Sequence, residues 1–236
     1  MASISNTFDG HADELAVTAA NLGTSGDAGA SVAKNNPTTI QYDSGDFMRG
    51  GMSVRFDFAA STAGYIRWNI AATSRVVQRA YYKFSDVSAG AETVMQMRNS
   101  SNLVMASVII QPSGMIQAST SSIVSAGNSA TGLVQNNVWY RLEVAVTKGT
   151  TSSNGKGEWS LYVGHSLNPI WSYTNAAVST GTTDVAVIQT GRTGPSSTGT
   201  QSIWVDDFQA QELASGWIGP SFNTAQMLPF FAGAGW

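Results

Sequence analysis

Apolar and polar residues alternate with a period of two in segment after segment of this chain. In residues 53–58 one side carries Val54, Phe56 and Phe58, and the pattern recurs at 65–70, 139–146, 159–163 and 203–208. Successive side chains of a β-strand point to opposite faces, so one side of each segment is expected to face the core and the other the solvent. The pattern predicts antiparallel sheets, each with one face packed on a core and one face in water.

Turn-forming residues separate roughly a dozen such segments, at the spacing expected for sandwiches and jelly rolls. Residues 14–22 are interpreted as a further strand, because Leu15 and Val17 alternate with Ala16 and Thr18. With 236 residues the chain is long enough for one all-β domain with a full core. We therefore expect a two-sheet antiparallel jelly-roll sandwich over residues 1–215, followed by a C-terminal tail at 216–236.

The composition is unusually low in charge. Charged residues make up 11% of the chain, against roughly 25% in a typical soluble domain. Such a surface is common in β-rich proteins of extracellular or particle surfaces. With a net charge of −3 and no basic run, binding to nucleic acid is not expected. The sequence shows no cysteine, no secretory signal at its beginning and no apolar run long enough for membrane insertion.

Six motifs, taken in order, are similar to those of a known group of domains. They resemble the concanavalin A-like (laminin G-like) jelly rolls common in actinobacteria and in the tail and head proteins of their phages, over about residues 4–220. The motifs are Asn6–Gly10, Ser25–Ala28, Ser53–Phe56, Val138–Val144, Ser202–Phe208 and Gly216–Pro220. The resemblance implies fold more than function, because lectins, glycosidases and structural modules share this architecture.

Three functions follow from the resemblance. The first is a non-enzymatic structural protein on the surface of a bacteriophage virion, as a head decoration or minor tail component, with other virion proteins and copies of itself as partners. The second is a carbohydrate-binding module that recognises glycans of the host cell envelope. The third is a glycoside hydrolase of concanavalin-like fold.

The acidic residues argue against the hydrolase. A retaining glycosidase needs two carboxylates about 5–5.5 Å apart. Glu143 is alone on its strand, and Asp206 and Asp207 are adjacent and are therefore expected on opposite faces. His11 and His165 are interpreted as loop histidines. The sequence thus predicts no catalytic residues and no enzyme.

A structural calcium ion is the one cofactor that the resemblance implies. Many carbohydrate-binding jelly rolls hold calcium where the first and last strands pair, and Asp9, Asp206 and Asp207 occupy the matching places. The alternative is that Asp9 lies in a turn, Asp206 is solvated and Asp207 is hydrogen-bonded at a sheet edge.

Aromatic residues provide candidate sugar contacts. Four are assigned to outward faces: Trp139, Tyr65, Tyr81 and Tyr173. The alternative is that they pack in the sandwich or anchor an interface. Five others are interpreted as core: Trp68, Trp159, Trp204, Tyr82 and Phe84.

The tail is apolar and broken by Gly and Pro. Its large apolar residues are predicted to dock, either on the chain's own sandwich or on another subunit. They are Trp217, Met227, Leu228, Phe230, Phe231 and Trp236.

Overall fold

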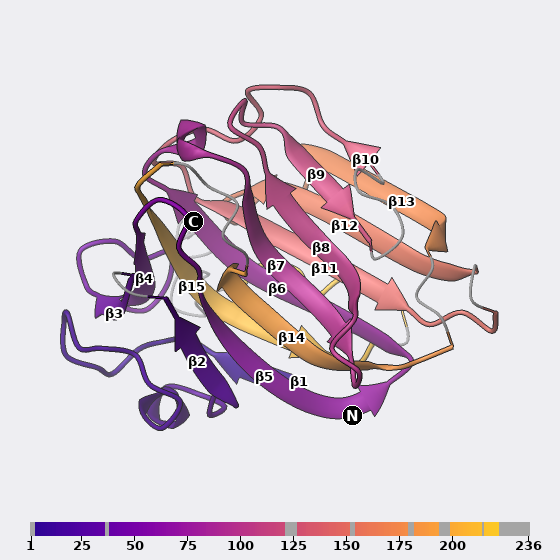
Figure 1. Ribbon diagram of the computed structural model, residues 1–236, viewed down its shortest axis with the longest axis horizontal. Coiled ribbons are helices and arrows are strands. Elements are labelled where there is room, and N and C mark those ends of the chain that lie inside the picture. Colours follow the sequence, from indigo (N-terminus) through magenta and orange to yellow (C-terminus); the bar gives the residue numbers. More distant parts are fainter. Residues whose placement is uncertain are drawn as a thin grey trace, which may run out of the picture.

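The computed structural model describes residues 3–35, 38–120, 127–151, 154–178, 182–193, 199–213 and 215–221. The chain forms two antiparallel β-sheets that stack as a sandwich (Figure 1). The predicted all-β architecture is confirmed. Two short 3-10 helices, η1 (Asn21–Thr24) and η2 (Val87–Ala89), interrupt the strands. Among the described residues, no helix is long and apolar enough to cross a membrane.

The first sheet, sheet A, has the strand order β13-β12-β11-β6-β15-β4-β3, and β1 also pairs with β15. In chain order its strands are β1 (Ser3–Asn6), β3 (Thr39–Asp43), β4 (Ser53–Phe58), β6 (Arg75–Phe84), β11 (Tyr140–Thr147), β12 (Gly155–Val163), β13 (Trp171–Val178) and β15 (Gln201–Gln211).

The second sheet, sheet B, has the order β10-β9-β8-β7-β14-β5-β2. Its strands are β2 (Ser31–Lys34), β5 (Gly64–Thr73), β7 (Glu92–Asn99), β8 (Val104–Ile110), β9 (Ile116–Ser119), β10 (Gly127–Asn128) and β14 (Val185–Arg192). The late strands β14 and β15 each lie between earlier strands, which gives the crossovers of a jelly roll.

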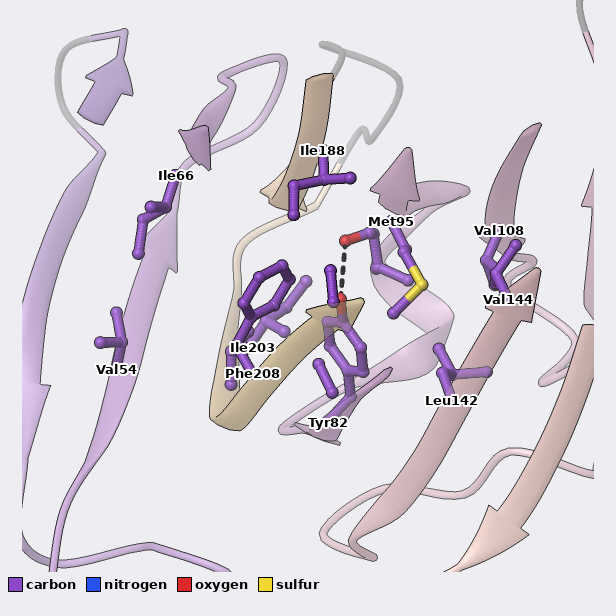
Figure 2. Packing of buried hydrophobic residues seen from close by; sticks show 14 of the residues in the cluster. Val54, Ile66, Tyr82, Met95, Val108, Leu142, Val144, Ile188, Ile203 and Phe208 are labelled. Atoms are coloured by element: carbon purple, nitrogen blue, oxygen red, sulfur yellow. Dashed lines mark hydrogen bonds between the residues drawn. The ribbon is translucent and has the colours of Figure 1, made fainter. Parts of the chain in front are cut away.

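The inward faces of the two sheets interlock in one apolar core (Figure 2). Phe208 of sheet A stacks on Trp68 of sheet B with ring centroids 4.2 Å apart. The hydroxyl of Tyr82 crosses between the sheets and bonds to Thr190 Oγ1 at 2.6 Å and to the carbonyl of Val94 at 3.1 Å. A buried hydroxyl needs such partners, so the two bonds fix how the sheets face each other.

Four of the five core assignments are confirmed, because Trp68, Trp159, Tyr82 and Phe84 are fully buried. The assignment of Trp204 is wrong. Its strand alternates so that Ile203 and Val205 enter the core, and Trp204 lies half-buried on the outer face. There its indole nitrogen donates to Asp43 Oδ2 at 3.0 Å, and the Lys83 ammonium lies 5.3 Å from the ring centroid.

The strand predicted at residues 14–22 is also wrong. Residues 14–17 make three backbone hydrogen bonds to Tyr42 and Ile40 of β3, with one isolated bridge between Ala16 and Gln41, and the chain then turns into η1. The reason is a local network: the Asn21 side chain accepts from the Thr18 amide and donates to the Ala16 carbonyl, and Thr18 Oγ1 accepts from the Asn21 amide. Side-chain bonds of this kind satisfy the backbone in a turn and compete with a sheet ladder.

Candidate functional site

Polar side chains gather on the outer face of sheet A, over its four central strands. The register of β12, β11, β6 and β15 aligns one row of outward residues: Tyr162, Arg141, Tyr81 and Asp206. The next outward row, two residues along, contains Ser160, Glu143, Arg79 and Gln209. Charged and aromatic groups that are distant in sequence therefore meet on one surface, which we call the sheet A site.

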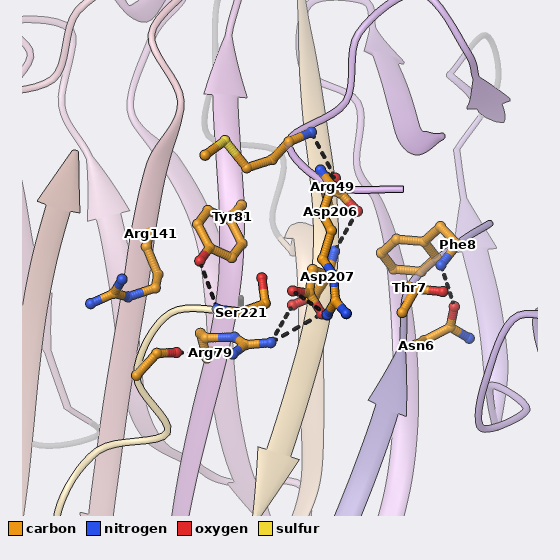
Figure 3. Close-up of polar contacts among 12 residues, drawn as sticks. Asn6, Thr7, Phe8, Arg49, Arg79, Tyr81, Arg141, Asp206, Asp207 and Ser221 are labelled. Atoms are coloured by element: carbon orange, nitrogen blue, oxygen red, sulfur yellow. Dashed lines mark hydrogen bonds and ion pairs between the residues drawn. The ribbon is translucent and has the colours of Figure 1, made fainter. Parts of the chain in front are cut away.

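A β-bulge adds a second carboxylate to this surface. The β15–β6 register shifts between Asp206 and Gln209, and Asp207 has a φ of 45°. Phe208 still turns into the core, whereas Asp207 reaches the outer face and pairs with Arg79 Nη2 at 3.0 Å (Figure 3). The expectation that Asp206 and Asp207 face opposite sides is wrong, because a bulge breaks the period-two rule.

The Asp206 carboxylate holds the loop between β3 and β4. It accepts from the amides of Met48 and Arg49 at 2.7 and 2.8 Å, and from the amide of Asp207 at 2.6 Å (Figure 3). Burial, assisted by the neighbouring charge of Asp207, raises the pKa of Asp206 to about 8. Asp206 therefore acts as an anchor for this loop.

Tyr81 and His165 form a hydrogen-bonded pair at the edge of this surface. Tyr81 Oη lies 2.9 Å from His165 Nδ1, and the two rings meet edge to face with centroids 5.2 Å apart. Burial and the positive charge of Arg141 lower the pKa of His165, which favours the neutral imidazole at neutral pH. In the neutral tautomer whose Nδ1 carries no proton, Nδ1 accepts the phenolic hydrogen, and the pair is then arranged to pass a proton.

Two guanidinium groups flank this pair. Arg141 forms an ion pair with Glu143 at 2.8 Å and lies over the Tyr162 ring, 3.8 Å from its centroid. Its Nη1 is buried and makes no hydrogen bond. Arg79 lies 5.8 Å from the centroid of Tyr81 and pairs with Asp207. Each guanidinium is already paired with a carboxylate of the chain, and Arg141 Nη1 and Arg79 Nε are the donors left for a further acceptor, such as a ligand carboxylate.

The residues around position 216, where the tail was predicted to begin, lie against the sheet A site. Arg79 Nη1 donates to the carbonyl of Gly219 at 2.9 Å, and the Gly219 amide donates to Glu143 Oε2 at 3.2 Å. The Ser221 amide donates to Tyr81 Oη at 3.1 Å (Figure 3).

Of the predicted docking residues, Trp217 is half-buried in this segment. The others lie outside the described residues: Met227, Leu228, Phe230, Phe231 and Trp236. Docking by the tail stays a prediction.

The three predicted calcium ligands have other partners. Asp9 Oδ1 accepts from the Gly51 amide at 2.8 Å, and Asp206 and Asp207 make the contacts described above. Within the described ranges, no group of three or more His, Cys, Asp or Glu residues is arranged to hold a metal ion. The calcium site stays a prediction.

The four predicted sugar contacts do not share one surface. Tyr81 lies on the outer face of sheet A and is fully buried, Trp139 is half-buried just before β11, and Tyr65 is half-buried on β5 of sheet B. The outward assignment of Tyr173 is wrong, because its ring packs against the core, 5.8 Å from Trp159. Register explains this, since Tyr173 pairs with the inward-facing Trp159.

No known family model matches the chain, and no curated protein does. Its fold, however, is similar to solved structures. An alginate lyase, Aly36B, whose structure contains an alginate trisaccharide, superposes with a TM-score of 0.61 at 9% identity, covering 90% of this chain and 98% of the lyase. A marine PL-14 alginate lyase from Aplysia kurodai gives 0.54 at 9% identity, with 75% and 91% covered. The cellulose-induced protein Cip1 gives 0.55 at 13% identity, with 80% and 94% covered.

These neighbours overturn the prediction that the chain is not an enzyme. Two alginate lyases have the same jelly-roll fold, and each of them aligns with most of this chain. The prediction depended on the absence of a carboxylate pair, and that absence bears only on glycoside hydrolysis. The hydrogen-bonded pair of Tyr81 and His165, which lie 84 positions apart, was not predicted from the sequence.

Proposed function

We propose that this protein cleaves an acidic, uronate-containing polysaccharide by β-elimination at the outer face of sheet A. The observation that carries the proposal is the 2.9 Å hydrogen bond between Tyr81 Oη and His165 Nδ1, set beside Arg79 and Arg141. The shared fold with alginate lyases supports it.

The arrangement supplies the parts that β-elimination requires. A base removes the proton from the carbon next to the uronate carboxylate, and the electron pair forms a double bond to the neighbouring ring carbon. The bond from that carbon to the glycosidic oxygen breaks, and the oxygen takes up a proton. In this proposal the neutral His165 and the Tyr81 phenol move these protons, and proton transfer by positioned side chains contributes about 10²–10⁴-fold to such reactions.

The arginines account for the choice of an acidic substrate. Removing a proton beside a carboxylate builds negative charge on that carboxylate, and a guanidinium stabilises this charge most in the transition state. Arg141 is 1% exposed and its Nη1 has no hydrogen bond. An unsatisfied buried donor is unusual, and a ligand carboxylate would supply its missing acceptor.

The test is to incubate the purified chain with alginate, polygalacturonate and hyaluronan and to follow the ultraviolet absorbance of unsaturated uronate ends. We expect product from at least one polymer, and a loss of about 100-fold or more in Tyr81→Phe and in His165→Gln. Tyr65→Phe, on the other sheet, is the matched control and keeps its activity. Binding without cleavage would indicate a carbohydrate-binding module instead. Product formation that survives both substitutions would refute the assignment of the site.

For the location of this activity, we propose the surface of a phage particle. The low content of charged residues, 11%, and the resemblance to phage head and tail domains support this location, with other virion proteins as partners. Mass spectrometry of purified particles tests it: the chain is expected among the stoichiometric particle proteins, and its absence from them would refute the location.

A further inference from the structure

We propose that residues 215–221 form a strap that occupies the polysaccharide site and must leave before a polymer can bind. The identity of the polymer depends on the proposed function, whereas the strap itself depends only on contacts within the chain.

The strap contacts the sheet A site at several points along β6. At one end Ser215 and Gly216 help to line a cavity of about 300 Å³ together with Arg75, Lys156 and Glu158. Further along, Gly219 lies between Arg79 and Glu143, and Ser221 reaches Tyr81. Because Arg75, Arg79 and Tyr81 lie in this order along β6, the strap runs along that strand and across both rows of the site.

The strap is held through its backbone. The carbonyl and amide of Gly219 bond to Arg79 and Glu143, and the amide of Ser221 bonds to Tyr81. Gly219 has a φ of +78°, and a Cβ there would meet no atom within 4 Å, so the contact uses main-chain groups only. These main-chain bonds occupy the same donors and acceptors that sugar hydroxyls and carboxylates would use.

The strap contacts buried groups of the site but leaves some of their polar atoms without a partner. Tyr81 and Glu143 are 0% exposed and Arg141 is 1% exposed. Three buried polar atoms in this place nevertheless make neither a hydrogen bond nor an ion pair: Arg141 Nη1, Arg79 Nε and Ser221 Oγ. Because buried polar groups are nearly always paired, a ligand with more acceptors has an advantage over the strap. This difference is what allows an acidic polymer to displace it.

The substitution Gly219→Pro releases the strap in the full chain. Proline cannot adopt a φ of +78° and has no amide to donate to Glu143. Gly132→Pro is the matched control: Gly132 has a φ of +72°, open space around it and one amide bond, to the Ser113 carbonyl at 2.7 Å. Both variants therefore lose one hydrogen bond donated by a backbone amide and one positive-φ glycine, but only the first changes the strap.

Two measurements read the result. Tyrosine nitration, located by mass spectrometry, reports whether Tyr81 is covered, and Tyr82 in the core reports that the sandwich stays folded. Affinity for alginate, polygalacturonate and hyaluronan reports access for the polymer. We expect Tyr81 to be nitrated in Gly219→Pro and protected in the parent and in Gly132→Pro. We expect the affinity for the polymer to rise about tenfold or more in Gly219→Pro alone, because binding no longer requires a minor open state.

Three results would decide against the strap or against the site. If Tyr81 is nitrated equally in all three proteins, or if it stays protected in Gly219→Pro, the strap does not cover the site. If Tyr81 is released but affinity is unchanged, the strap does not control access. If Tyr81 is released only in Gly219→Pro and none of the proteins binds or cleaves any polymer, the strap stands and the proposed function fails.

Discussion

Removing the carboxylate of Glu143 is expected to destabilise the fold strongly. Glu143 is 0% exposed, and its partner Arg141 is 1% exposed at 2.8 Å. After Glu143→Ala, the contact that remains for the Arg141 guanidinium among the described residues is the Tyr162 ring, 3.8 Å from the centroid. Breaking a buried ion pair from one side costs about 3–5 kcal/mol, since the remaining charge has no compensation. The lost bond to the Gly219 amide adds about 1 kcal/mol.

The assay is urea unfolding, with the free energy of unfolding taken from the linear extrapolation. The double variant Arg141→Met/Glu143→Leu is the control, because it removes both charges and fills a similar volume. Replacing a whole buried pair is often neutral, so we expect the double variant within about 2 kcal/mol of the parent. A single variant that loses less than about 1 kcal/mol, or a double variant as unstable as the single one, would refute the claim that an isolated buried charge causes the loss.

Three other changes test the fold. Because burial raises the pKa of Asp206 to about 8 from an ordinary 3.8, the folded chain holds a proton there that the unfolded chain releases. The free energy of unfolding should therefore fall as the pH rises from about 4 to 8. Asp206→Asn should flatten this slope, as measured from urea midpoints. Tyr82→Phe should cost about 1–2 kcal/mol in urea unfolding because it leaves the Val94 carbonyl without this donor, and an unchanged midpoint would contradict the assignment. Gly191→Ala should lower the thermal midpoint more than Gly132→Ala does. A Cβ at position 191 would lie 2.6 Å from the Gly64 carbonyl oxygen, whereas one at position 132 would meet open space. Equal shifts in the two variants would argue against this packing.

The fold was predictable from the sequence because each strand carries its own signal. The alternation of Val54, Phe56 and Phe58 is local, and it needs no knowledge of the neighbouring strand. The same rule failed at Asp206 and Asp207, where a bulge with a φ of 45° places two adjacent side chains on one face. A bulge is fixed by pairing between distant strands, so the local pattern did not reveal it.

The candidate site was not predictable for a related reason. Tyr81 was recognised as outward, but its partner His165 follows another strand, and only the order β12-β11-β6 in sheet A brings them together. The segment at Gly216–Ser221 was predicted to begin a tail that docks on the sandwich or on another subunit, but its backbone bonds to Arg79, Glu143 and Tyr81 were not predicted. Main-chain contacts of this kind leave no trace in a hydropathy pattern.

The pH dependence of the proposed polysaccharide cleavage is the most direct test of the central claim, that Tyr81 and His165 form the reactive pair. Burial and Arg141 lower the pKa of His165 from 6.5, and only the neutral imidazole accepts a proton. We expect unsaturated product, formed at a rate that rises with pH through an inflection below 6.5 and then levels off. This rise at acidic pH, the acid limb of the profile, should disappear in His165→Gln together with most of the rate. An absence of unsaturated product at every pH, or an acid limb that stays unchanged in His165→Gln, would contradict the account.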